Sequence, residues 1–275
     1  MDQKQNILRL VLASDATGDT VSAASAAVTS QFEALDVRVK RFRFVRSQAA
    51  VTSVLSAIDH QTDVVLYTLS DRDHADQVAL HCQAVGAKGF ALLDPLFQAV
   101  ADVTKQKPEL KPGGQYALNT QYFDRVAAID YAISHDDGLS SSYLDQADVL
   151  VFGISRTSKT PTCIYLAYQG IRAANIPLVL NQPLPADILA RLKSGMRAVG
   201  LVASVARLAQ VRQNRLLALG QGSLDDYTDR GYIQEELVAA RLFFEKYKIP
   251  VIDVTRRSIE ETAAAIREQV LDQNE

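Results

Sequence analysis

The sequence predicts an α/β protein in which an N-terminal parallel-sheet region precedes a second α/β domain with a phosphate-binding loop (P-loop). Three observations support this fold class. Short apolar runs alternate with segments of helical periodicity, a pattern typical of parallel sheets covered by helices on both faces. A polar segment rich in proline and glycine interrupts the alternation near residue 105. Beyond it, a loop containing glycine and lysine stands between a predicted strand and a predicted helix.

The N-terminal region begins with a compact apolar run at residues 7–13, which is typical of a buried strand. Residues 37–45 alternate apolar and basic side chains, as expected of a half-exposed strand. Further strands are predicted at 64–69 and 90–93, and helices at 21–35, 47–58 and 72–84.

Residues 105–120 are predicted to link two domains. Lys105-Gln-Lys-Pro-Glu-Leu-Lys-Pro-Gly-Gly is polar and holds two prolines and two glycines, so it favours neither helix nor strand. We therefore assign residues 1–104 to an N-terminal α/β domain and residues 121–275 to a nucleotide-binding catalytic domain. No internal repeat is apparent in the sequence.

The second domain is predicted to open with a helix at residues 123–134 and a buried strand at 149–152, with a helix starting at Pro161. Further strands are predicted at 177–180, 198–202 and 251–254, and helices at 186–193, 204–219, 233–247 and 258–270.

Composition excludes several classes of function. The chain has 275 residues, 48% of them hydrophobic, and a net charge of −3, so no general attraction to nucleic acid is expected. No apolar run reaches membrane-spanning length, and residues 1–5 lack the order of a signal peptide. Two cysteines in predicted helices, Cys82 and Cys163, indicate neither a disulfide framework nor a cysteine metal site. These features favour the cytoplasm.

The most informative stretch runs from Gly153 to Thr160. It nearly matches the P-loop pattern G-x-x-x-x-G-K-[ST], in which backbone N–H groups hold phosphate oxygens. Lys159 would carry positive charge to the outer phosphates, and the Thr160 hydroxyl would ligate Mg²⁺. Ser158 stands where the pattern has its second glycine, and serine adopts a positive φ less freely. A plain polar turn is the alternative. The predicted nucleotide-binding residues are Gly153, Ile154, Ser155, Arg156, Thr157, Ser158, Lys159 and Thr160.

A second cluster of chemically capable residues, His135, Asp136 and Asp137, precedes the loop in sequence. Adjacent carboxylates repel, so a shared cation or proton would relieve the pair. One carboxylate would hold Mg²⁺ while the other accepts a proton from an attacking hydroxyl. A helix end followed by a turn rich in Asp and Gly explains the same residues without function.

Other polar segments leave two interpretations open. Arg156 fits either a phosphate ligand or a solvated loop charge. Arg207, Arg212 and Arg215 fit a solvated helix face, which the pattern favours, or an anion site. Residues 14–20 and 253–256 follow strands at the carboxyl edge, where α/β proteins bind ligands, but loop polarity also explains them. Ser258 and Glu261 fit a capping box.

Four motifs together resemble one family: Ser14-Asp-x-Thr-Gly-Asp-Thr, Tyr131-Ala-x-Ser-His-Asp-Asp-Gly, Gly153-x-Ser-Arg-Thr-Ser-Lys-Thr-Pro and Asp253-Val-Thr-x-Arg-Ser-Ile-Glu-Glu-Thr-Ala. The chain looks like the bifunctional kinase–pyrophosphorylases that regulate pyruvate, phosphate dikinase or phosphoenolpyruvate synthase. The resemblance covers nearly the whole chain, and a serine at position 158 is normal for that family.

The resemblance implies a protein serine/threonine kinase that uses ADP as phosphoryl donor and inactivates its partner enzyme. It also implies the reverse task, in which inorganic phosphate removes the group and pyrophosphate is released. We expect Lys159 to hold the ADP phosphates and Thr160 to hold Mg²⁺ together with Asp136 or Asp137. The other carboxylate, or His135, is expected to act as base. Arg156 is the candidate for holding inorganic phosphate.

Two other functions remain open from the sequence: a small-molecule kinase that uses ATP, and a nucleotide-sensing module without catalysis. The sequence also leaves open which partner enzyme is the target and whether the two activities share one site. Regulators of this kind often form homodimers, but no heptad pattern indicates one here.

Overall fold

The structure, a computed structural model, describes residues 6–114, 120–136, 144–218 and 225–271. The chain divides into two compact units, Met1–Ala117 and Leu118–Glu275, and each is described by itself. Both units are α/β, so the predicted fold class is confirmed. The division falls within the segment for which the sequence predicts a linker.

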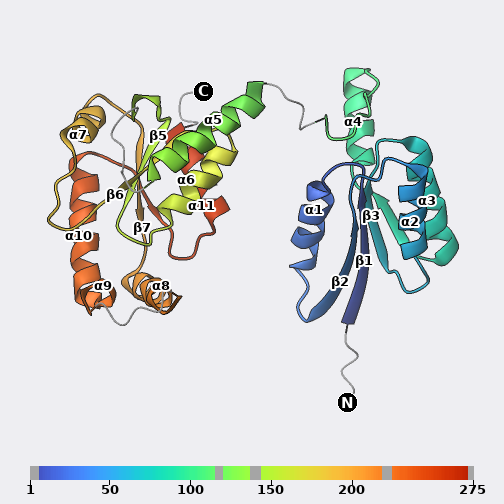
Figure 1. Cartoon of the computed structure of the whole chain (residues 1–275), viewed down its shortest axis with the longest axis horizontal. Helices are drawn as coiled ribbons and strands as arrows, with labels where there is room; N and C mark the ends of the chain where they lie inside the picture. The colour runs from blue at the N-terminus through green and yellow to red at the C-terminus, as the bar shows by residue number, and fades with distance from the viewer. Residues whose placement is uncertain (1–5, 115–119, 137–143, 219–224, 272–275) are drawn as a thin grey trace, which may run out of the picture. The chain divides into compact units, whose positions relative to one another are not determined.

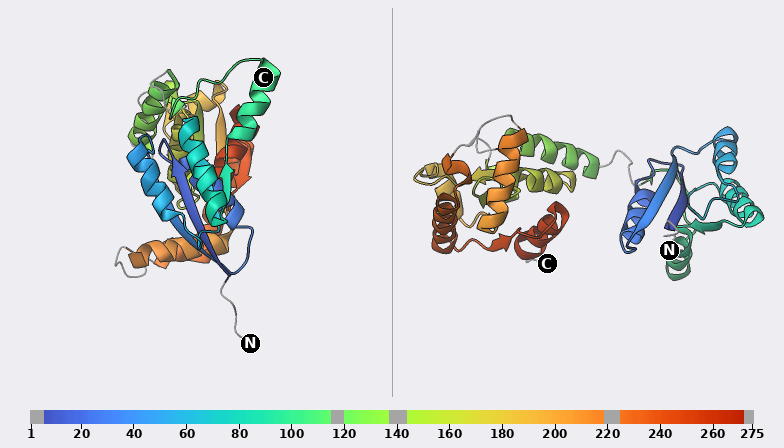
Figure 2. Two further views of the ribbon diagram at one scale, coloured as in Figure 1. Left: turned by 90° about the vertical axis from the view of Figure 1, so that its right-hand side faces the viewer. Right: turned by 90° about the horizontal axis from the view of Figure 1, so that it is seen from below.

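The first unit is built on a parallel sheet of strand order β2-β1-β3-β4. Its strands are β1 (Asn6–Ser14), β2 (Leu35–Phe42), β3 (Val64–Thr68) and β4 (Lys88–Ala91), and its helices are α1 (Asp19–Thr29), α2 (Gln48–Ala57), α3 (Arg72–Val85) and α4 (Asp94–Thr104). Figures 1 and 2 show α1 on one face of this sheet and α2 and α3 on the other. The half-exposed strand predicted at 37–45 is confirmed in type, since β2 alternates between exposed and partly buried residues.

The second unit repeats that arrangement in a parallel sheet of strand order β6-β5-β7-β8. Its strands are β5 (Val149–Gly153), β6 (Ala173–Pro177), β7 (Ala198–Val202) and β8 (Val251–Asp253). Its helical elements are α5 (Thr120–Ser134), η3 (Leu144–Gln146), α6 (Lys159–Tyr168), α7 (Ala186–Lys193), α8 (Val205–Ala218), α9 (Asp225–Thr228), α10 (Arg230–Lys246), α11 (Ile259–Ile266) and η4 (Arg267–Leu271). Figure 1 shows α5, α6 and α11 on one face and α7 and α10 on the other.

The core of the second unit surrounds the two central strands. Every residue of β5 and β7 is buried, as expected of parallel strands covered on both faces. Gly200 in β7 is required by packing, because a Cβ atom there would lie 2.7 Å from the Phe244 ring of α10. Gly200 pairs with Phe152 of β5, so this close packing lies beside the carboxyl end of β5, where the chain leaves the sheet and the predicted phosphate loop begins.

One predicted strand is wrong. The sequence favoured residues 177–180, but the strand is β6, which ends at Pro177. The Val-Leu run at 179–180 has the stronger strand propensity, whereas β6 reads Ala-Ala-Asn-Ile-Pro and gives little signal. Pairing with β5 and burial decide the strand, and after Pro177 the chain leaves the sheet.

Helix α4 was missing from the prediction, although Asp94-Pro95 is a helix-start signal. All of its side chains are at least partly exposed, so its apolar residues do not mark a core face. The first predicted helix, 21–35, also extends too far, because α1 ends at Thr29 and β2 begins at Leu35. The predicted Ser258–Glu261 capping box is confirmed at the start of α11. Among the described residues, no helix is long and apolar enough to cross a membrane.

Candidate active site at the phosphate loop

The loop after β5 needs glycine at its first position. A Cβ atom on Gly153 would lie 2.5 Å from Thr157 Oγ1 and 2.8 Å from the Leu201 carbonyl oxygen. The loop therefore turns so tightly against β7 that no side chain fits at the strand end. This close approach is what a P-loop glycine provides.

The helix start behind the loop is left without a side-chain cap. Ser158 is the N-cap of α6 with φ 62°, in the left-handed region, and Arg156 has φ 70°. Serine thus adopts the conformation for which the general pattern has glycine. Helices α2, α3, α10 and α11 are capped by Ser47, Asp71, Asp229 and Ser258, whereas α1, α4, α6 and α7 have no side-chain cap. An anion can bind the N–H groups at such a helix start.

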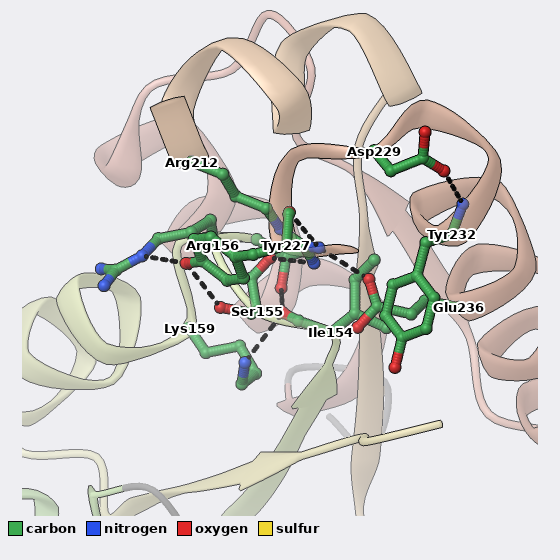
Figure 3. Close-up of polar contacts among 10 residues, drawn as sticks. Ile154, Ser155, Arg156, Lys159, Arg212, Tyr227, Asp229, Tyr232 and Glu236 are labelled. Carbon is green, nitrogen blue, oxygen red and sulfur yellow. Dashed lines mark hydrogen bonds and ion pairs between the residues drawn. The ribbon is translucent and has the colours of Figure 1, made fainter. Parts of the chain in front are cut away.

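Lys159 lies inside the loop. Its Nζ donates to the Ile154 carbonyl oxygen at 3.0 Å (Figure 3). Thr157 Oγ1 donates to the same oxygen at 2.9 Å. The side chain is buried, with 6% exposed. An ammonium group has three donors, so Lys159 can hold this carbonyl and still donate to a phosphate. Burial of the neighbouring Cys163 raises the pKa of its thiol to about 12, although the Lys159 charge opposes the shift.

Asp136 and Thr160, the two predicted metal ligands, are brought together. Thr160 Oγ1 donates to Asp136 Oδ1 at 2.8 Å, across 24 positions of sequence. Asn175 of β6 joins them, since its Nδ2 lies 2.7 Å from Asp136 Oδ1 and 3.0 Å from Thr160 Oγ1. The sequence analysis missed Asn175, a polar residue fully buried in a short strand. Only the strand pairing shows that it faces the loop.

His135 lies in the core just beyond the end of α5. Its ring stacks on Tyr131 with centroids 4.0 Å apart, and Nδ1 lies 2.9 Å from the Tyr131 carbonyl oxygen. Its own carbonyl oxygen accepts from the Asn175 backbone N–H at 3.2 Å. With 4% of its surface exposed, His135 is placed to anchor Asp136 beside Thr160. A role as base stays a prediction, and Asp137 lies outside the described residues.

The position of Arg212 on α8 differs from the sequence prediction. The pattern favoured a solvated face, but Arg212 is 1% exposed, while Arg207 and Arg215 are exposed. Arg212 shares the buried face of α8 with Leu208 and Leu216, four positions away on either side. That i±4 relation to two leucines was the available signal for its burial. Its Nη2 donates to the Ser155 carbonyl oxygen of the loop at 3.1 Å.

A cavity of about 780 Å³ opens at the loop, within the size range of small-molecule sites. Residues from the loop, α6, β6, α8, α9 and α10 line it: Ser155, Arg156, Ser158, Lys159, Thr160, Pro161, Pro177, Leu178, Val179, Val211, Arg212, Tyr227, Tyr232 and Glu236. Tyr227, Tyr232 and Glu236 were not predicted from the sequence. Gly153, Ile154 and Thr157 lie beneath this surface and shape the loop from inside.

The remaining polar motifs line other cavities. Residues 14–20 border one of about 330 Å³ in the first unit, at the carboxyl ends of β1 and β3. Asp253, Thr255 and Arg256 border another of about 780 Å³ beyond β8. Thr255 Oγ1 accepts from the Ser204 backbone N–H at 2.8 Å, and hydrogen bonds from Thr255 hold the pKa of Asp253 below its ordinary value. The Asp253 segment is thereby tied to the end of β7.

Comparison with known proteins identifies relatives along nearly the whole chain. A protein from Chelativorans sp. (strain BNC1) is 41% identical over 266 residues, covering 97% of both chains. One from Agrobacterium fabrum is 43% identical over 268 residues, with 97% of each covered. One from Caulobacter vibrioides is 43% identical over 255 residues, covering 93% of this chain and 80% of its own. All three are named pyruvate, phosphate dikinase regulatory protein.

Residues 10–266 match the family described as kinase/pyrophosphorylase. That description names two activities, a kinase and a pyrophosphorylase. The chain therefore belongs to the kinase/pyrophosphorylase family.

Proposed function

We propose that this protein regulates pyruvate, phosphate dikinase by phosphorylating one of its threonines with ADP as donor. The β-phosphoryl group of ADP moves to the threonine hydroxyl, and AMP and a proton are released. In the opposite task, inorganic phosphate takes the group from phosphothreonine, which gives pyrophosphate and free threonine. The names of the relatives support the dikinase as partner over phosphoenolpyruvate synthase.

The observation that carries this proposal is the loop itself, with Asp136 hydrogen-bonded to Thr160 at its helix end. Phosphoryl transfer depends on positioning and on neutralising charge, so one cradle of N–H groups and one ammonium suits both directions. In this proposal Lys159 and the loop amides hold the phosphates. Asp137, or Asp136 if it is free of metal, accepts the threonine proton.

Mg²⁺ fits the oxygen atoms beside the loop. The Asp136 carboxylate and the Thr160 hydroxyl are hard oxygen ligands 2.8 Å apart, and Mg²⁺ usually takes one or two carboxylates together with substrate phosphates. The described ranges contain no group of three or more His, Cys, Asp or Glu able to hold a metal. A bound Mg²⁺ would neutralise phosphate charge, and Asn175 would orient the two ligands.

The test is a transfer assay with ADP labelled in its β-phosphate and purified pyruvate, phosphate dikinase as acceptor. We expect label on one threonine, identified by mass spectrometry, and loss of dikinase activity. Adding inorganic phosphate without nucleotide should then release labelled pyrophosphate and restore the activity. Label from γ-labelled ATP on a small molecule would instead support an ATP-dependent kinase, and ADP binding without any transfer would support a sensing module.

A further inference from the structure

The short helix α9 brings a tyrosine onto the phosphate loop from a distant part of the chain. The Tyr227 hydroxyl lies 3.2 Å from Ser155 Oγ and accepts from Arg156 Nε at 3.2 Å. Figure 3 shows the phenol pointing at the loop between these two residues. Burial raises the pKa of Tyr227, but the two hydrogen bonds and the nearby guanidinium charges lower it, and the net pKa lies below its ordinary value.

Tyr227 is held from behind by Arg212. The Arg212 guanidinium carbon lies 4.9 Å from the centre of the Tyr227 ring, and Nη1 donates to the Tyr227 carbonyl oxygen at 3.1 Å. The same nitrogen donates to Glu236 Oε2 at 2.7 Å, in a pair whose side chains are 1% and 9% exposed. A buried charge pair of this kind is costly to break, so it fixes the tyrosine firmly. Since Nη2 also holds the loop at Ser155, one guanidinium connects α9, α10 and the loop.

Among the described residues, Arg156 is held through a single side-chain nitrogen. Its side chain is exposed, and within the described part of the chain Nε is the atom that makes its hydrogen bond. Figure 3 shows the terminal nitrogens directed away from Tyr227. Those two nitrogens form the planar fork that binds phosphate in bidentate fashion. The hydroxyl of Tyr227 therefore orients Arg156 without occupying its phosphate-binding edge.

We propose that Tyr227 is a positioning residue that orients Arg156 for the outer phosphate of a bound diphosphate or for inorganic phosphate. This inference rests on the proposed function and identifies which contacts complete the site. An arginine that is already oriented loses less conformational freedom on binding, so removing the hydroxyl should weaken phosphate binding about threefold to tenfold.

A double-mutant cycle tests the proposal on the full chain. The variants are Tyr227→Phe, Arg156→Ala and the two combined, and the measurement is the dissociation constant of magnesium pyrophosphate by isothermal titration calorimetry. Tyr227→Phe should weaken binding about threefold to tenfold, and adding it to Arg156→Ala should weaken binding no further. Tyr168→Phe is the matched control, because Tyr168 is a tyrosine of α6 that is 61% exposed. This variant should bind magnesium pyrophosphate with the affinity of the wild type.

The transfer assay supplies a second readout that a purely structural role would not move. Tyr227→Phe should raise the KM for inorganic phosphate with kcat within about twofold of wild type. Unchanged binding by Tyr227→Phe, or equal losses in the presence and absence of Arg156, would overturn the inference. A wild-type chain that binds pyrophosphate but transfers nothing from ADP refutes the proposed function alone, and the binding cycle still decides the role of Tyr227.

Discussion

The two units share a strand order but differ at the end of the first strand and at the start of the helix that follows it. In each, the first strand is flanked by the second and third, and the fourth follows the third. In each unit, the helix that follows the first strand begins after a left-handed N-cap without a side-chain cap, Gly18 with φ 82° before α1 and Ser158 with φ 62° before α6. The first helical residue is Asp19 in α1 but Lys159 in α6. The two helix starts thus have the same backbone conformation at the N-cap but first residues of opposite charge.

The end of the first strand differs as well. Gly153 ends β5, where a Cβ atom would clash, whereas Ser14 ends β1 and its hydroxyl accepts from Thr68 Oγ1 at 2.9 Å. Asp15 follows and accepts from the Ser70 backbone N–H at 2.6 Å. The Asp15 carboxylate thereby ties the loop after β1 to residue 70, just after β3. Both units have an uncapped helix start after the first strand, but the second unit combines it with Gly153 at the strand end and Lys159 at the helix start, on which the proposed phosphate site depends.

The largest expected effect comes from removing the charge that distinguishes the two loops. Lys159→Ala should lower ADP-dependent transfer about 100- to 1,000-fold, because no other loop side chain brings an ammonium to the phosphates. Steady-state kinetics on the dikinase acceptor measures it. The matched change in the first unit, Asp19→Ala, should leave ADP affinity within about twofold. If Lys159→Ala transferred the phosphoryl group at the wild-type rate, the proposed role of the loop in the reaction would be wrong.

The two cysteines allow the units to be compared in one experiment, since Cys82 is buried in the first unit and Cys163 in the second. Burial raises both thiol pKa values, that of Cys163 to about 12, so at pH 8 both stay protonated and react with iodoacetamide only after opening. ADP at about 100 times its dissociation constant should slow labelling of Cys163 about 100-fold and leave Cys82 unchanged. Mass spectrometry of labelled peptides measures both rates. If ADP slowed the labelling of Cys82 and Cys163 equally, the two units would unfold together, which would contradict this prediction.

Gly153→Ala should lower the free energy of unfolding of the second unit by about 1–3 kcal/mol, because the added methyl group meets the backbone of β7. Denaturant titration followed by Cys163 labelling measures the change. The control is Gly114→Ala in the first unit, where the nearest atom to an added Cβ is Lys111 Cβ at 3.9 Å. Equal stability of both variants would contradict the tight turn at the end of β5.

Exchanging the two N-cap residues should have the smallest effect. Ser158→Gly should keep ADP affinity and change stability by less than about 1 kcal/mol, since relief at φ 62° is offset by a more flexible unfolded chain. Gly18→Ser should destabilise the first unit by about 1 kcal/mol. Thermal unfolding measures the change in stability of each variant, and a binding titration measures the ADP affinity of Ser158→Gly. A large loss of ADP affinity in Ser158→Gly would show that the serine hydroxyl itself takes part in binding.

The sequence predicted most elements because their signals are local. Apolar runs marked β1, β3, β5 and β7, and the capping box at Ser258 marked the start of α11. It failed where packing overrides propensity, as in β6, whose alanines and asparagine are a strand because β5 pairs with them. The sequence also contained no sign that the two units share a strand order. Strand order depends on burial and strand pairing, which different residues can satisfy, so it leaves no internal repeat in the sequence.

The sequence by itself indicated the chemistry that we propose for the loop, since the spacing of Gly153, Lys159 and Thr160 is visible in one short segment. Only the tertiary structure decided what surrounds it. Asn175 reaches Asp136 across 39 positions, and Tyr227 reaches Arg156 across 71. Such contacts depend on how strands and helices pack, and they leave no periodic trace in the sequence. Arg212 illustrates the difference: its charge suggested solvent, whereas its place between two buried leucines put it in the core.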